Sequence, residues 1–208
     1  MLLLLVRHGL TAHTGHRLSG WIPGIHLDER GRVEAEDVAR RLEPVPLDAV
    51  YSSPIDRALE TARPTAKAKR LRIRTREDFG EVRYGDWEGR RLDVLVKNKL
   101  WPQLMASPGS IRFPGGEALR ETQARAVNGV EALRADHDRR AVAVFTHADV
   151  IRLLVAHYTG VHIDLYQRLS IGTGSISAVW LGRLGPRVLK MNDTGSLSGL
   201  VPPKRRKR

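Results

Sequence analysis

The fold is decided by a nine-residue stretch at the start of the sequence, Met1-Leu2-Leu3-Leu4-Leu5-Val6-Arg7-His8-Gly9. Its continuous apolar run predicts a strand buried on both faces, because a strand covered by helices on both sides of a parallel sheet does not alternate with polar residues. A second run of this kind, from Ala141 to Thr146, leads into His147. Since ligands bind at the carboxyl ends of strands in open α/β sheets, both histidines are expected in one crevice. Two histidines there indicate proton or phosphoryl chemistry.

Strand and helix signals alternate along the rest of the chain. Further strands are predicted at 49–52, 71–75, 175–181 and 187–191, and the last two form an antiparallel hairpin at the sheet edge. Helices are predicted at 28–42, 54–69, 92–105, 118–136 and 149–158, with Ser53 capping the second and Pro54 in its first position. This alternation predicts the α/β class: a three-layer α/β/α sandwich with a mostly parallel sheet and an antiparallel edge strand.

Length and composition favour one domain over residues 1–200, followed by a basic, disordered tail at 201–208. The formal net charge is +12, and the five residues 204–208 are all basic. The absence of cysteine excludes disulfides, thiolate metal sites and cysteine nucleophiles. No stretch is apolar enough to span a bilayer, and the first apolar run is shorter than the roughly 7–15 residues of a signal-peptide core. We therefore expect a cytoplasmic protein.

Arginines and a helix start join the two histidines at the predicted sheet edge. The first strand delivers Arg7 next to His8, and the helix after the second strand carries Arg57 in its first turn. A helix N-terminus attracts phosphate through its free N–H groups and its dipole, and a guanidinium matches the geometry of phosphate oxygens. The sequence therefore predicts a phosphate-binding pocket.

The order of these residues along the chain resembles the histidine phosphatase superfamily, which includes the cofactor-dependent phosphoglycerate mutases. The resemblance extends from about residue 1 to residue 182. The segments that carry it are Arg7-His8-Gly9, Ser52-Ser53-Pro54 with Arg57 and Thr61-Ala62, Glu81 with Tyr84-Gly85-Asp86-Trp87-Glu88-Gly89, Pro114-Gly115-Gly116-Glu117 and Thr146-His147.

The resemblance implies a catalytic role for each of five residues. His8 would be the nucleophile and would form a phosphohistidine, while Arg7, Arg57 and His147 would hold the phosphoryl oxygens. Glu81 would protonate the leaving alcohol and then activate the water that hydrolyses the intermediate. Two arginines and a His147 imidazolium would supply the charge that a metal supplies elsewhere, so that neither metal nor cofactor is expected.

The loop around residue 81 offers more than one candidate for the acid. Glu81 is favoured because the family's acid precedes a Tyr-Gly-x-x-x-Gly pattern by three residues, but Asp78, Asp86 and Glu88 in the same loop are alternatives.

Other residues are expected around the pocket. His13, His16 and His26 lack the spacing of metal ligands, while Trp87 is expected to be a wall of the pocket. Residues expected to bind phosphate or substrate, with Trp21 as a second wall, are Thr11, Thr14, Gly20, Trp21 and Ala148.

The sequence thus predicts a metal-independent phosphomonoester hydrolase that acts through a phosphohistidine on a small phosphorylated metabolite. A cofactor-dependent mutase is an alternative, but mutases carry a longer insertion in this region, whereas Glu81 and Glu117 are only 36 residues apart here. Leu10 and Thr14 also stand where mutases commonly have glutamate and asparagine. An alternative from another class is a basic nucleic-acid-binding protein with a vestigial pocket; we expect only non-specific nucleic-acid binding, through the tail. The oligomeric state stays open, with a homodimer as one arrangement.

Overall fold

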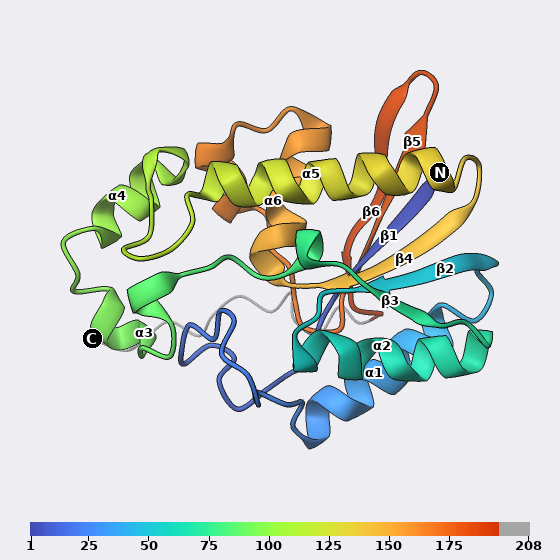
Figure 1. Ribbon diagram of the computed structural model, residues 1–208, viewed down its shortest axis with the longest axis horizontal. Coiled ribbons are helices and arrows are strands. Elements are labelled where there is room, and N and C mark those ends of the chain that lie inside the picture. Colours follow the sequence, from blue (N-terminus) through green and yellow to red (C-terminus); the bar gives the residue numbers. More distant parts are fainter. Residues whose placement is uncertain (196–208) are drawn as a thin grey trace, which may run out of the picture.

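A six-stranded sheet forms the centre of the computed structural model, which describes residues 1–195 (Figure 1). The strand order is β3-β2-β4-β1-β5-β6. The strands are β1 (Leu2–Arg7), β2 (Leu47–Ser52), β3 (Ile73–Thr75), β4 (Ala141–Thr146), β5 (Ile176–Gly182) and β6 (Gly185–Asp193). The first four run parallel, whereas β5 is antiparallel to β1 and β6 is antiparallel to β5. The predicted mostly parallel sheet with an antiparallel edge is confirmed.

The register of the two central strands explains why the distant histidines meet. β1 and β4 pair in parallel with Arg7 opposite Thr146. His8 and His147 are each the next residue, so they leave neighbouring strands at the same level. Parallel pairing therefore brings the two histidines to the same edge of the sheet, as the sequence predicts.

Two layers of helices cover the sheet, one on each face (Figure 1). Leu4 and Val6 of β1 pack on one side with α1 (Glu29–Arg41) and α2 (Asp56–Lys69). Leu3 and Leu5 pack on the other side with α5 (Leu119–Asp136) and α6 (Ala148–Thr159). Successive side chains of a strand point to opposite faces, so burial on both sides accounts for the unbroken apolar run. The predicted α/β/α sandwich is confirmed.

A smaller apolar cluster lies beyond the carboxyl ends of the parallel strands, where residues 80–117 pack against α5 and α6 (Figure 1). The helix predicted at 92–105 is wrong as a single element, because the structure has α3 (Leu92–Leu95) and α4 (Trp101–Ala106). The side chain of Asn98 accepts a hydrogen bond from the Leu100 N–H at 2.9 Å, and Pro102, near the start of α4, has no N–H to continue an earlier helix.

The start of α2 also differs from the prediction. The helix begins at Asp56 rather than Pro54, and no side chain caps it. Ser53 does not cap α2 because its hydroxyl lies 2.8 Å from Nε2 of His147, although it also accepts a weak bond from the Ile55 N–H at 3.3 Å. Within residues 1–195, no helix is long and apolar enough to cross a membrane. The predicted tail at 201–208 lies outside the described residues.

Candidate active site

His8 is held in one tautomer. Its Nδ1 lies 2.8 Å from the Gly9 carbonyl oxygen, which can only accept, so Nδ1 carries the proton. The Nε–H of Arg57 donates to Nε2 of His8 at 3.3 Å, which requires a lone pair on Nε2. Burial, followed by the charges of Arg57 and Arg7, lowers the pKa of His8 well below its ordinary value. The ring is therefore neutral, with an unprotonated nitrogen beside a guanidinium.

His147 lies next to His8, with 5.2 Å between the ring centroids. Its Nε2 contacts Ser53, while its Nδ1 lies 4.0 Å from Oε2 of Glu81 and has no hydrogen-bond partner in the described part of the chain. Burial and the neighbouring Arg57 lower the pKa of His147 well below its ordinary value. The neutral form of His147 is thus favoured among these neighbours, and the imidazolium inferred from the sequence for phosphoryl transfer stays a prediction.

Two arginines, partly buried Arg7 and buried Arg57, have hydrogen-bond donors to spare. Arg7 donates from Nη1 to the Ile171 carbonyl at 2.6 Å, and Arg57 donates from Nη2 to the Gly20 carbonyl at 3.0 Å. The remaining Nε of Arg7 and Nη1 of Arg57 are buried and, among residues 1–195, unpartnered. An unpaired buried donor is costly, so these two N–H groups are ready to donate to an anion.

Glu81 is an acid that keeps a substantial protonated fraction at neutral pH. Burial, followed by the negative charge of Asp149, raises the pKa of Glu81 to about 7. Its backbone is fixed from two sides, because its carbonyl accepts hydrogen bonds from Trp21 Nε1 at 2.6 Å and Arg125 Nη2 at 2.8 Å. Glu81 lines the cavity beside His8, which none of the three alternative acids in its loop does.

A cavity of about 220 Å³ lies where these side chains converge. Arg7, His8, Arg57 and Glu81 reach its wall, whereas His147 is fully buried next to it. The residues that line the cavity are Arg7, His8, Thr14, Gly15, Arg17, Leu18, Ser19, Gly20, Arg57, Glu81, Tyr84, Leu92, Ala148, Asp149 and Arg152. The cavity is thus strongly cationic, with two carboxylates on its wall.

The other predicted pocket residues divide into two groups. Thr14, Gly20 and Ala148 line the cavity as expected. Thr11 and Trp21 do not: the Thr11 hydroxyl lies 3.0 Å from that of Thr14, and Trp21 supports the backbone of Glu81.

The expected wall at Trp87 is wrong. This side chain is 2% exposed and belongs to the apolar cluster of residues 80–117. Its ring stacks on Trp101 with 6.3 Å between centroids. Burial of the apolar indole in that cluster is more favourable than its exposure to a polar cavity.

Sequence reasoning missed a hydrogen-bonded group on the cavity wall. Asp149 accepts from the Tyr84 hydroxyl at 2.7 Å and from Nη1 of Arg152 at 2.8 Å. A signal for part of it existed, because Ala148, Asp149 and Arg152 share the first turn and a half of a helix that begins directly after His147, and residues three or four apart share a helix face. The contact with Tyr84 had no such signal.

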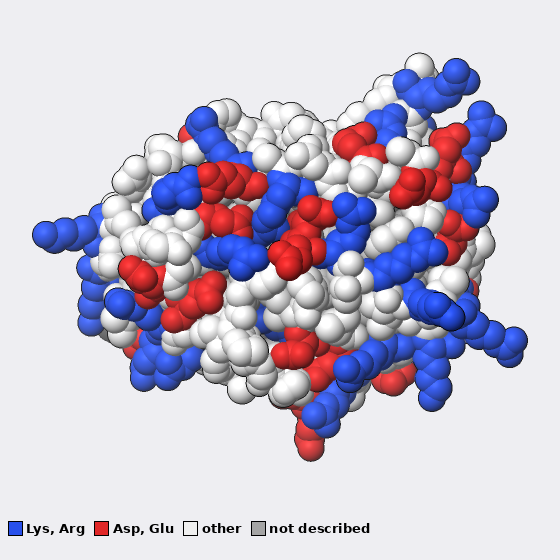
Figure 2. Space-filling model, in the orientation of Figure 1, with Lys and Arg blue, Asp and Glu red and all other residues white. Residues whose placement is uncertain are grey.

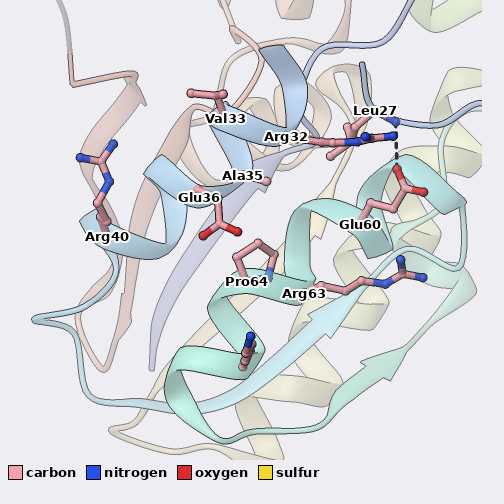
Figure 3. A pocket seen from close by; sticks show the side chains of 10 residues that line it. Leu27, Arg32, Val33, Ala35, Glu36, Arg40, Glu60, Arg63 and Pro64 are labelled. Atoms are coloured by element: carbon pink, nitrogen blue, oxygen red, sulfur yellow. Dashed lines mark hydrogen bonds between the residues drawn. The ribbon is translucent and has the colours of Figure 1, made fainter. Parts of the chain in front are cut away.

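A larger hollow lies elsewhere, between α1 and α2, and measures about 720 Å³ (Figure 3). Arg32, Glu36 and Arg63 line it, and the Leu27 N–H donates to Glu60 at its rim (Figure 3). None of the predicted catalytic residues reaches it. Chemistry rather than size therefore identifies the candidate site.

His13, His16 and His26 do not form a cluster of metal ligands within the described residues. Within residues 1–195, no group of three or more histidine, aspartate or glutamate side chains is placed to hold a metal ion. Nδ1 of His26 instead lies 2.6 Å from Oε1 of Glu60.

The fold and this cavity define an α/β protein with two histidines, two arginines and a glutamate of raised pKa gathered at the carboxyl edge of a mostly parallel sheet. The sequence pattern of the histidine phosphatase superfamily (branch 1) matches residues 3–194, and the chain belongs to this superfamily. The protein is accordingly an enzyme of the phosphatase class, a hydrolase.

Relatives agree with this assignment. Phosphoserine phosphatase 1 of Hydrogenobacter thermophilus is 27% identical over 197 residues, which cover 92% of each chain. Phosphoglycerate mutase-like protein 4 of Arabidopsis thaliana is 31% identical over 159 residues, covering 73% of this chain and 68% of its own. The solved structure of Bacillus stearothermophilus YhfR is 28% identical with a TM-score of 0.86, covering 92% of this chain and 96% of that one.

Proposed function

We propose that the protein hydrolyses phosphomonoesters of small metabolites through a phosphohistidine on His8, without a metal. The observation that carries the proposal is the fixed tautomer of His8, with its proton on Nδ1 and its lone pair on Nε2. A nucleophile needs that lone pair, and the lowered pKa keeps Nε2 unprotonated at neutral pH.

In the first step, Nε2 of His8 forms a bond to phosphorus while the ester P–O bond breaks. Glu81, protonated because its pKa is about 7, gives its proton to the departing oxygen. The spare donors of Arg7 and Arg57 hold the equatorial oxygens, where negative charge is spread in the transition state. The helix N-terminus at Ala148 adds its dipole.

In the second step, the ionised Glu81 takes a proton from water, whose oxygen bonds to phosphorus as the N–P bond breaks. Inorganic phosphate leaves, and both His8 and Glu81 return to their starting protonation states. The same carboxyl group thus serves as acid and then as base.

Hydrolysis is favoured over mutase chemistry because residues 82–116 form only a short segment with two short α-helices and two single-turn 3-10 helices. The name of the Hydrogenobacter relative makes phosphoserine one ester to include in a substrate screen.

The test is hydrolysis of p-nitrophenyl phosphate in EDTA by the wild type and by His8→Ala. We expect metal-independent turnover that is lost in His8→Ala and retained in His157→Ala, a control at an exposed histidine on α6. Rapid quenching with ³²P-labelled ester should trap an acid-labile, alkali-stable label on the wild type. Activity that persists in His8→Ala would overturn the mechanism, and 3-phosphoglycerate with a bisphosphoglycerate primer tests the mutase alternative.

A further inference from the structure

A second cavity, of about 300 Å³, adjoins the catalytic one. Leu18, Tyr84, Asp149 and Arg152 line both cavities and so form the boundary between them. A ligand whose phosphoryl group lies at His8 can therefore extend from the catalytic cavity into the second one.

The polar groups on the boundary are already paired with one another. Asp149 accepts hydrogen bonds from Tyr84 and Arg152, and Nε of Arg152 also donates to the Leu169 carbonyl at 2.9 Å. Because the guanidinium of Arg152 neutralises the Asp149 carboxylate, this pair does not require a charged ligand group as a partner.

The wall of the second cavity beyond the boundary is largely apolar. It is formed by Trp101, Leu104 and Met105 of α4 together with Phe113, and Tyr166 and Gln167 complete it. Phe113 is buried, whereas the Met105 side chain is about half exposed at 49%. Aromatic and thioether side chains around a small hollow favour an apolar guest, and methionine adapts to its shape.

We infer that this second cavity binds the alcohol portion of the substrate, and that this portion is apolar, of the size of an aromatic ring or a short alkyl chain. The inference rests on the proposed function, because it requires the phosphoryl group to lie at His8. It narrows the substrates to phosphomonoesters of apolar alcohols. Esters of small polar alcohols fill only the catalytic cavity.

Binding of non-hydrolysable phosphonates tests the inference without depending on turnover. Each buried methylene raises affinity roughly fourfold, so 2-phenylethylphosphonate should bind the full-length protein at least about tenfold more tightly than ethylphosphonate in calorimetry. Both ligands carry the same charged group, so their affinity ratio reports the second cavity alone.

A charge placed in the second cavity should remove the preference for 2-phenylethylphosphonate over ethylphosphonate. We expect Met105→Glu to lower the affinity ratio to about one. Val96→Glu is the matched control, because Val96 is similarly exposed at 47% and lines neither cavity, and its ratio should equal that of the wild type. Thermal melting checks that both variants fold.

Two results would separate the possible failures. A wild-type ratio near one, or equal ratios in wild type and Met105→Glu, overturns the second cavity as a binding site even when His8-dependent hydrolysis is present. A ratio above ten in a protein without His8-dependent hydrolysis supports the cavity and refutes the proposed chemistry.

Discussion

At the scale of single residues, the proposed role of Glu81 as general acid predicts how activity depends on pH. Its pKa of about 7 means that the acid form needed for the first step is lost as pH rises above neutrality. We expect kcat/KM for an alkyl phosphate to fall above about pH 7. In Glu81→Gln this decline should vanish and kcat/KM should drop roughly 10²–10⁴-fold, as for loss of a general acid.

Leaving-group dependence provides the control for that result. Nitrophenolate leaves without protonation, so Glu81→Gln should lose much less of the first step with p-nitrophenyl phosphate, measured as burst-phase release of nitrophenol. An equal loss with both esters would contradict the role of Glu81 as acid.

The same residue makes a separate prediction for stability. Its folded-state pKa is raised from 4.5 to about 7, so the folded protein binds more protons than the unfolded chain between these values, and stability decreases as pH rises through them. Glu81→Gln removes this decrease. Relative to wild type, the variant should gain on the order of 3 kcal/mol between pH 4.5 and pH 8 in urea unfolding.

The buried histidines change stability with pH in the opposite direction to Glu81, but their effect is the same in wild type and in Glu81→Gln and cancels in the difference between them. The folded-state pKa values of His8 and His147 are lowered, so both contributions to stability are present above about pH 6.5 and are lost as pH falls below it. Both proteins carry the same histidines, and the difference between them isolates Glu81. A pH-independent difference would show that burial does not disfavour the Glu81 carboxylate.

At the scale of elements, the first turn of α1 presses against the backbone that follows His8. A Cβ at Gly31 would lie 2.1 Å from the Leu10 carbonyl oxygen, and a Cβ at Gly9 would lie 2.5 Å from that of Gly31. Asp28 caps the helix by accepting from the Gly31 N–H at 2.8 Å. The close approach of two backbones thus couples the start of α1 to the active-site turn.

Substitution of Gly31 tests that coupling. Alanine would gain about 1 kcal/mol of helix propensity, but overpacking against backbone costs about 1–3 kcal/mol. We expect Gly31→Ala to be destabilised by up to about 2 kcal/mol in urea unfolding and to lose kcat as the turn after His8 shifts. Arg32→Ala, an exposed change in the same turn, should remain within about 0.5 kcal/mol of wild type. A more stable Gly31→Ala would show that the turn yields without cost.

At the scale of the whole molecule, the formal charge of +12 attracts anions without selecting among them. Basic and acidic side chains are interspersed over the visible face rather than gathered in one basic track (Figure 2). The five basic residues 204–208 are the densest positive segment of the sequence and lie outside the described residues.

Duplex DNA binding, measured at several salt concentrations for the full chain and for a chain without residues 204–208, therefore shows whether the tail or the folded part of the protein attracts DNA. We expect weak binding by the full chain, with a slope of log affinity against log salt of up to about −4, and loss of that slope when residues 204–208 are removed. Phosphatase activity should be the same in both proteins. A truncated protein that still binds DNA with a steep slope would favour the nucleic-acid-binding alternative.

Much of the site could be read from the sequence because it depends on strand ends. Continuous apolar runs identify buried parallel strands, and parallel strands end at one edge, so Arg7, His8 and His147 were predictable neighbours. Arg57 was placed correctly even though α2 starts two residues later than predicted, because it remains in the first turn.

The sequence by itself thus determined the sandwich, the edge at which the site lies and the residues that the strands deliver there. Only the tertiary structure showed that Glu81, which its sequence position already favoured, lines the cavity while its neighbouring acids do not, that burial lowers the pKa of His147 and that Tyr84 pairs with Asp149. The physical reason is that strand periodicity is local, whereas desolvation and side-chain pairing depend on atoms brought together from distant parts of the chain.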